Sequence, residues 1–303
     1  MKKKHLTGLI ALGAAATLVL AGCASDNGET TDPGDASTAP EETQSITMGF
    51  LPAWTDGLST AYLLKDQLGK LGYDVKMEEV VDAGPLYVAL SQGDVDMYPS
   101  AWSEVTHAQY MEEVGDDVED LGSYYDGAAL TIAVPSYLTD INSLEELKAN
   151  ADLFDGQIIG IEPGAGLTAA TERMIGEYEL DNYELVTSST TAMLATLDTA
   201  YAAQEPVVVT LWRPFWAYAS WDMKDLADPL GAMGATESLH FLGKLGFAAE
   251  FPEAADYISK MQLDDAQYGA LESLVTSDEY AGNPDGAVQE WLAEFGSQID
   301  WLI

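Results

Sequence analysis

The chain has 303 residues and carries 51 acidic side chains against 12 basic ones, which gives a formal net charge of −39. This charge argues against nucleic acid as a partner, because phosphate contacts need clustered lysine and arginine. A single cysteine excludes a disulfide within the chain, and the length favours two lobes over one core.

The first element in chain order is an export signal. Three lysines precede an apolar run from Leu6 to Leu20, and the run ends in the sequence LAGC, a bacterial lipobox. A membrane-spanning helix needs about 20 residues, so we expect residues 1–22 to be a cleaved signal peptide and not a permanent anchor. The lipobox resemblance implies that Cys23 is acylated and that its lipid chains hold the protein at the outer face of the membrane.

The next segment is a tether. Residues 24–44 contain no aromatic or large aliphatic side chain and are rich in Ser, Thr, Asp, Glu, Gly and Pro. Such a composition buries too little apolar surface to fold. We therefore predict that residues 23–44, from the acylated cysteine onward, form a flexible linker to the folded body.

The body alternates strand-like and helix-like patterns, which is typical of mainly parallel sheets covered by helices. Strands are expected at 46–51, 74–80, 95–98, 129–135, 157–161, 184–186, 206–211 and 237–242. Helices are expected at 58–71, 85–92, 167–178, 192–202, 252–261, 264–273 and 284–295. We predict that residues 45–132 and 233–303 form lobe I and that residues 133–232 form lobe II.

Three tryptophans follow predicted strands. Two lobes joined by crossing strands can close over a small solute, and ligands of open α/β sheets lie beyond the carboxyl ends of strands. Trp54, Trp102 and Trp212 all stand in loops at such strand ends. One tryptophan alone is more often part of a core, but the shared position of three favours a binding site.

The chemistry of these rings points to a class of ligand. A quaternary ammonium group has no N–H to donate, so a site must surround its methyl groups with electron-rich ring faces. Each desolvated cation–π contact contributes on the order of 2 kcal/mol. We therefore predict an aromatic cage for a small quaternary ammonium compound.

Four segments carry a resemblance to a known family. They are GFLPAWTDGLST (49–60), Ala101-Trp102 with the nearby Thr106-His107, GIEPGAG (160–166) and VTLWRPFW (209–216). With them, residues 46–295 resemble the glycine betaine and choline substrate-binding proteins of osmoprotectant ABC importers. The resemblance implies a two-lobed, type II periplasmic-binding-protein-like α/β fold, with the ligand in the cleft between two mainly parallel sheets flanked by helices.

The resemblance also assigns roles to residues. Trp54, Trp102 and Trp212 match the cage, and Asp56 resembles a carboxylate that lies beside the ammonium group in the choline-binding branch, although it is equally interpreted as a loop-capping residue. The backbone amides of Gly57 and Leu58 are candidates for holding a ligand carboxylate, because helix N-termini favour anions.

The sequence departs from the family pattern at several positions. In many betaine binders the last of these segments resembles W-S-P-H-W. This chain has Arg213 in place of the serine and Phe215 in place of the histidine. Arg213 is expected to supply the missing charge-assisted donor to a carboxylate, or else to brace the loop. Proteins of the choline-binding branch resemble a pattern with a tyrosine just before the crossing strand and an asparagine in the GIEPG loop. This chain has Leu130 and Ala165 near those places. Glycine betaine is therefore the predicted ligand, with choline or carnitine as alternatives.

An enzyme is not expected. After the signal peptide the chain has only two histidines, His107 and His240, and no Walker, HExxH or GxSxG motif, so we predict neither a catalytic site nor a metal or cofactor. An amino-acid binding protein is a distant alternative, because three tryptophans fit a primary ammonium group poorly. The expected partners are a membrane permease and its cytoplasmic ATPase, to which a monomer would deliver its ligand.

Overall fold

The computed structural model describes residues 43–303. The predicted signal peptide, Cys23 and the predicted linker as far as residue 42 lie outside the described residues. Within the described part of the chain, no helix combines the length and apolar character needed to cross a membrane.

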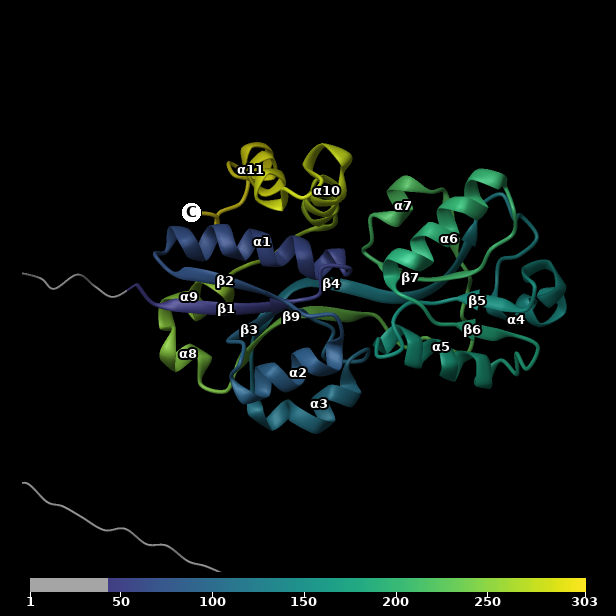
Figure 1. Ribbon diagram of the computed structural model, residues 1–303, viewed down its shortest axis with the longest axis horizontal. Coiled ribbons are helices and arrows are strands. Elements are labelled where there is room, and N and C mark those ends of the chain that lie inside the picture. Colours follow the sequence, from purple (N-terminus) through teal and green to yellow (C-terminus); the bar gives the residue numbers. More distant parts are fainter. Residues whose placement is uncertain (1–42) are drawn as a thin grey trace, which may run out of the picture. The chain divides into compact units, whose positions relative to one another are not determined.

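The body contains strands and helices in alternation (Figure 1). The strands are β1 (Ser45–Phe50), β2 (Asp74–Glu79), β3 (Met97–Ala101), β4 (Val118–Pro135), β5 (Gln157–Ile159), β6 (Glu184–Val186), β7 (Val209–Arg213), β8 (Met223–Asp225) and β9 (Glu237–Lys244). The helices are α1 (Thr55–Lys70), α2 (Ala83–Gln92), α3 (Ala108–Val114), α4 (Leu144–Leu147), α5 (Gly166–Glu177), α6 (Thr190–Ala203), α7 (Ala217–Ser220), α8 (Phe247–Glu250), α9 (Pro252–Ile258), α10 (Asp265–Thr276) and α11 (Pro284–Phe295), with 3-10 turns η1 (Gly115–Asp117), η2 (Lys148–Phe154) and η3 (Asp278–Tyr280).

The strands follow the order β2-β1-β3-β9-β4-β7-β5-β6, and β8 pairs with β4. The outer pairs β1–β2, β1–β3, β5–β6 and β5–β7 are parallel. The pairs that involve β4 or β9 are antiparallel. The two ends of the sheet are thus wound like parallel α/β sheets, and β4 connects them because it pairs with β9 in its first part and with β7 and β8 in its last.

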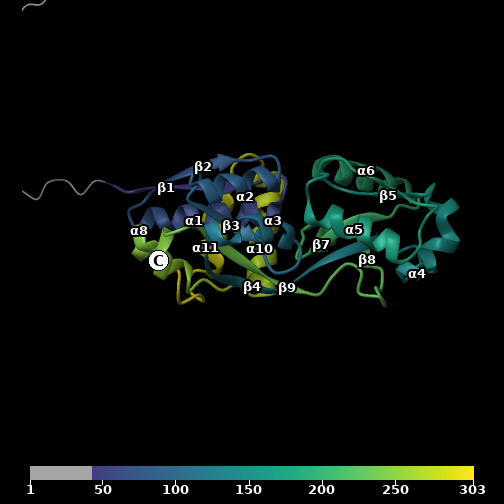
Figure 2. The ribbon, with the colours of Figure 1, turned by 90° about the horizontal axis from the view of Figure 1, so that it is seen from below.

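Helices cover both faces at each end of the sheet. We call β1–β3, β9, α1–α3 and α8–α11 the first lobe, and β5–β8 with α4–α7 the second lobe. Figure 1 shows α1, α10 and α11 over one face of the first lobe and α2 and α3 over the other. Figure 2 shows the same division from below, with β4 running from one lobe to the other.

The core follows from the hydrophobic pattern. Ile46, Met48 and Phe50 alternate along β1 and are fully buried, as expected for one face of a strand. Leu64 and Leu68 lie one turn apart on α1 and are also fully buried. Each such side chain contributes about 1.5–3 kcal/mol by leaving water. The packing of these buried side chains holds α1 against β1. Trp54 lies between the end of β1 and the start of α1.

Most predicted elements are confirmed, and β4 needs the main correction. The predicted strand at 129–135 begins eleven residues earlier, at Val118. The early part contains polar residues and two glycines, Gly122 and Gly127, and its register with β9 shifts at several points. Bulges of this kind break the apolar alternation that reveals a strand. The short elements α3, α4, α7, α8 and β8 were not predicted, and the lobe boundaries at 132/133 and 232/233 stay predictions.

Candidate ligand-binding site

The three predicted tryptophans line one cavity of about 30 Å³, together with Asp56. Trp54 precedes α1, Trp102 follows β3, and Trp212 lies in β7, so the first lobe supplies two rings and the second lobe one. All three are at most 8% exposed. The remaining lining comes from residues that the sequence analysis did not assign to the ligand, namely Thr106, His107, Leu130, Ile161, Ala165, Gly166 and Leu167.

Trp54 is held from two sides. Its ring stacks on the buried His107 ring, with centroids 5.9 Å apart and planes 19° apart. Its indole Nε1 donates to Glu162 Oε2 over 3.3 Å, and Glu162 also accepts hydrogen bonds from the Thr190 amide and hydroxyl, each at 2.8 Å. Burial lowers the pKa of His107 to about 3, so this imidazole is neutral at physiological pH.

Trp102 is oriented by Asp56. The indole Nε1 donates to Asp56 Oδ2 over 3.0 Å, and the Ser100 hydroxyl donates to the same oxygen over 2.7 Å. Burial raises the pKa of Asp56, while the hydrogen bonds from Trp102, Ser100 and the Gly57 amide oppose that rise. Asp56 lies inside the first turn of α1 and does not cap it. It therefore places a buried carboxyl group in the wall of the cavity.

Trp212 has a different support. Its ring stacks on Phe215, with centroids 3.8 Å apart and planes 24° apart. Phe215 occupies the position of the histidine in the family pattern, and here its ring supports that of Trp212. The Trp212 Nε1 is buried and has no hydrogen-bond partner among the described residues, which leaves one N–H donor beside the cavity.

The structure does not bring Arg213 into the cavity. Its Nε donates to Asp225 Oδ2 over 2.6 Å, and its guanidinium lies 3.6 Å from the centre of the Tyr218 ring. Successive side chains of a strand point to opposite faces, so Trp212 and Arg213 cannot both face the ligand. The brace role proposed from the sequence fits this position, and the carboxylate-donor role does not.

The backbone amides of Gly57 and Leu58 are also engaged elsewhere. The Leu58 amide donates to the Trp54 carbonyl over 3.0 Å, as the first bond of α1. The Gly57 amide hydrogen-bonds the Asp56 carboxyl. Neither residue lines the cavity, so the predicted carboxylate site at this helix start is not formed in this structure.

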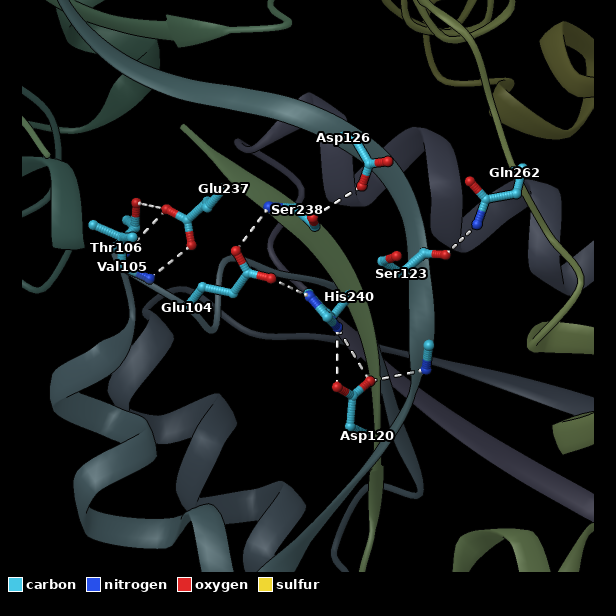
Figure 3. A network of polar contacts seen from close by, with 11 residues as sticks. Glu104, Val105, Thr106, Asp120, Ser123, Asp126, Glu237, Ser238, His240 and Gln262 are labelled. Atoms are coloured by element: carbon cyan, nitrogen blue, oxygen red, sulfur yellow. Dashed lines mark hydrogen bonds and ion pairs between the residues drawn. The ribbon is translucent and has the colours of Figure 1, made fainter. Parts of the chain in front are cut away.

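A polar network fixes the segment between Trp102 and α3 to the crossing strands (Figure 3). Glu237, at the start of β9, accepts hydrogen bonds from the Val105 amide at 3.0 Å, the Thr106 amide at 3.0 Å and the Thr106 hydroxyl at 2.5 Å. Burial alone would lower the pKa of His240, but hydrogen bonds to Glu104 and Asp120 outweigh it and raise that pKa. The lining residue Thr106 is thus tied to β9, and Glu104 is tied through His240 to Asp120 of β4.

The lobes meet directly around the cavity. The Tyr110 hydroxyl of α3 donates to the Gly164 carbonyl of the GIEPGAG loop over 2.5 Å. A Cβ on Gly166 would lie 2.1 Å from the Thr106 carbonyl oxygen, so this position needs a glycine for the close approach. Glu272 of α10 accepts from the Thr55 hydroxyl over 2.5 Å and from the backbone amide of Trp216, and burial raises its pKa to about 8.

Residues 44–294 match the family model of the substrate-binding domain of ABC-type glycine betaine transport systems. The chain belongs to this family. Among curated relatives, the glycine betaine/carnitine transport binding protein GbuC of Listeria monocytogenes is 41% identical over 99 residues, which cover 32% of this chain and 33% of that protein. The aligned stretch thus spans about a third of the relative.

Two solved structures of this kind cover the whole body. The glycine/betaine/L-proline-binding protein ProX of Borrelia burgdorferi has 31% identity and a TM-score of 0.79, covering 86% of this chain and 97% of its own. Lactococcal OpuAC, in a closed conformation with glycine betaine, has 30% identity and a TM-score of 0.78, covering 86% and 100%. These similarities confirm the type II periplasmic-binding-protein-like fold and the osmoprotectant-binding family predicted from the sequence. As a substrate-binding domain of an ABC importer, the body is extracytoplasmic.

Proposed function

We propose that this protein binds a small quaternary ammonium compound in the cavity between Trp54, Trp102 and Trp212 and delivers it to an ABC permease. The convergence of three buried rings from both lobes carries the proposal. Ring faces attract a methylated cation without any donor from the ligand, and the partly desolvated site strengthens that attraction. Glycine betaine is the proposed ligand, as the family match and the relatives support.

A second candidate is choline, and Asp56 favours it. This carboxyl group lines the cavity, whereas no lysine or arginine among residues 43–303 does. A carboxylate attracts the single positive charge of choline but repels the carboxylate of a betaine. The buried N–H of Trp212 is a donor that would compensate a betaine, because it has no partner within residues 43–303.

Calorimetric titration of the soluble body, residues 45–303, tests the proposal. Glycine betaine, choline, proline and glycine are titrated in parallel. We expect saturable heat with at least one of the two trimethylammonium compounds and much weaker binding of proline and glycine. Binding of proline or glycine as tight as that of both trimethylammonium compounds would contradict the cage and favour an amino-acid binding protein.

The remaining parts of the proposal concern the protein's place in the cell. We propose that residues 1–22 are removed, that acylated Cys23 anchors the protein on the outer face of the membrane, and that the body acts as a non-catalytic monomer beside its permease and ATPase. Cys23→Ala is expected to move the protein from the membrane fraction to the soluble fraction after export. Retention of this variant in the membrane fraction would exclude the lipid anchor.

A further inference from the structure

A second cavity adjoins the cage and has a different character. It measures about 150 Å³, against about 30 Å³ for the cage cavity, and the two share Thr106, Leu130 and Gly166 in their walls. The cage cavity is therefore the smaller of the two. Of these two cavities, the second is the one with space for a long substituent on the ammonium group of a ligand.

One face of α5 forms a wall of the second cavity. Gly166, Ala169, Ala170 and Arg173 all line it, at the spacing i, i+3, i+4 and i+7 that places residues on one side of a helix. The first three side chains are small and leave room. Because side chains on a helix lean toward its N-terminus, Arg173 leans from the far end of this face toward Gly166, which borders both cavities.

The lack of an ion-pair partner within residues 43–303 distinguishes Arg173 from most other basic residues of this part of the chain. Its Nε donates to the Ala232 carbonyl over 3.1 Å, which fixes the guanidinium at the cavity wall. Within residues 43–303 it makes no ion pair, although the chain is strongly acidic and the other arginine, Arg213, is paired with Asp225. The guanidinium therefore keeps its terminal N–H groups for a carboxylate, which it can bind in a bidentate manner.

From these observations we propose that Arg173 in the second cavity binds the carboxylate of an extended betaine. Such a ligand has about three carbons between its trimethylammonium group and its carboxylate, as carnitine and γ-butyrobetaine have. The proposal rests on the proposed function, because the tryptophan cage must hold the ammonium end. This position in the second cavity also keeps the ligand carboxylate away from Asp56, which would repel that carboxylate within the cage.

The test compares carnitine and choline by calorimetric titration of residues 45–303 and its variants. Arg173→Gln is expected to weaken carnitine about 10- to 100-fold, the size of a lost hydrogen bond to a charged group, and to change choline less than twofold. Arg173→Lys should recover part of the carnitine affinity. Arg213→Gln removes the same charge from the paired arginine outside both cavities and is expected to change neither ligand.

A second variant tests the cavity itself. Ala169→Leu fills its wall on the same helix face and is expected to weaken carnitine while choline still binds, which also shows that the variant is folded. Unchanged carnitine affinity in Arg173→Gln, or equal losses of carnitine and choline, would overturn the role of Arg173. If wild-type protein binds neither choline, glycine betaine nor carnitine, the proposed function itself fails.

Discussion

Each cage tryptophan depends on a different partner for its orientation. Glu162 holds the indole of Trp54, Asp56 holds that of Trp102, and Phe215 supports the ring of Trp212. Because these partners fix the rings before a ligand arrives, little side-chain freedom remains to be lost on binding. The three rings are therefore held in place for the proposed cation.

Removal of one ring should weaken binding by a predictable amount. Trp212→Ala is expected to lower the affinity for glycine betaine and choline by about 2 kcal/mol, or about 30-fold, the value of a desolvated cation–π contact. Trp301→Ala is the matched control, since Trp301 packs against Tyr257 and does not line the cavity. Titration calorimetry of both variants measures the difference, and equal effects would contradict the cage.

Asp56 should separate choline from betaine. Asp56→Asn keeps an acceptor for the Trp102 indole and removes the charge, so we expect it to weaken choline at least tenfold and to leave glycine betaine unchanged or tighter. The pKa of Asp56 is raised by burial. A cation favours the ionised carboxylate, so choline affinity should fall as the pH drops through this raised pKa, and the variant should lack this dependence.

The sequence predicted that the three tryptophans and Asp56 lie together because their motifs follow strand ends, although Trp212 lies within β7 and not in the loop predicted after residue 211. Arg213 was misplaced because the strand predicted to end at residue 211 continues through Arg213, and alternation along β7 turns this side chain away from Trp212. Thr106 and His107 were noted in the family pattern but not assigned to the ligand. Leu130 and Ala165 were noted only as departures from the choline-binding pattern, and the fold places both in the cavity wall.

At the scale of elements, the contact between the GIEPGAG loop and the first lobe is the most sensitive point. Gly166→Ala is expected to weaken every ligand at least tenfold, because its Cβ would lie 2.1 Å from the Thr106 carbonyl oxygen and push the loop away. Gly176→Ala on the same helix has nothing within 4 Å of its added Cβ. It should leave binding unchanged and raise stability by up to about 1 kcal/mol.

These two glycine variants are compared by titration calorimetry and thermal unfolding. Normal ligand affinity in Gly166→Ala would show that the close approach of the lobes is not required for binding. The sequence predicted some of these elements better than others. The helix ends around the site were predicted within a few residues, whereas the early half of β4 was missed because its bulges and glycines hide its periodicity.

At the scale of the whole body, Glu272 joins the C-terminal helices to both lobes. Its carboxyl group meets Thr55 at the start of α1 and the Trp216 amide of the second lobe, and its pKa is raised to about 8, first by burial and also by the charge of Asp56. A carboxyl with a raised folded-state pKa binds its proton more tightly in the folded than in the unfolded protein. Its contribution to stability is therefore lost as pH rises from about 4.5 to about 8.

We expect the free energy of unfolding of the wild type to fall by up to about 1.4 kcal/mol per pH unit across this window, the limit for one proton. Glu272→Gln should lose this part of the slope. Glu290→Gln, at an exposed position of α11, should keep it. Chemical unfolding at several pH values measures the slopes, and identical slopes in all three proteins would refute the assignment to Glu272.

A neutral isostere shows whether the three rings bind a methylated cation. Choline and 3,3-dimethylbutan-1-ol, which has carbon in place of the charged nitrogen, are titrated into residues 45–303. The same comparison is made for glycine betaine and 3,3-dimethylbutanoate. We expect that at least one charged compound binds and that its isostere loses at least 100-fold in affinity, as for several cation–π contacts of about 2 kcal/mol each. Equal binding of the isosteres would show that the rings recognise shape and apolar surface alone, which contradicts the cage.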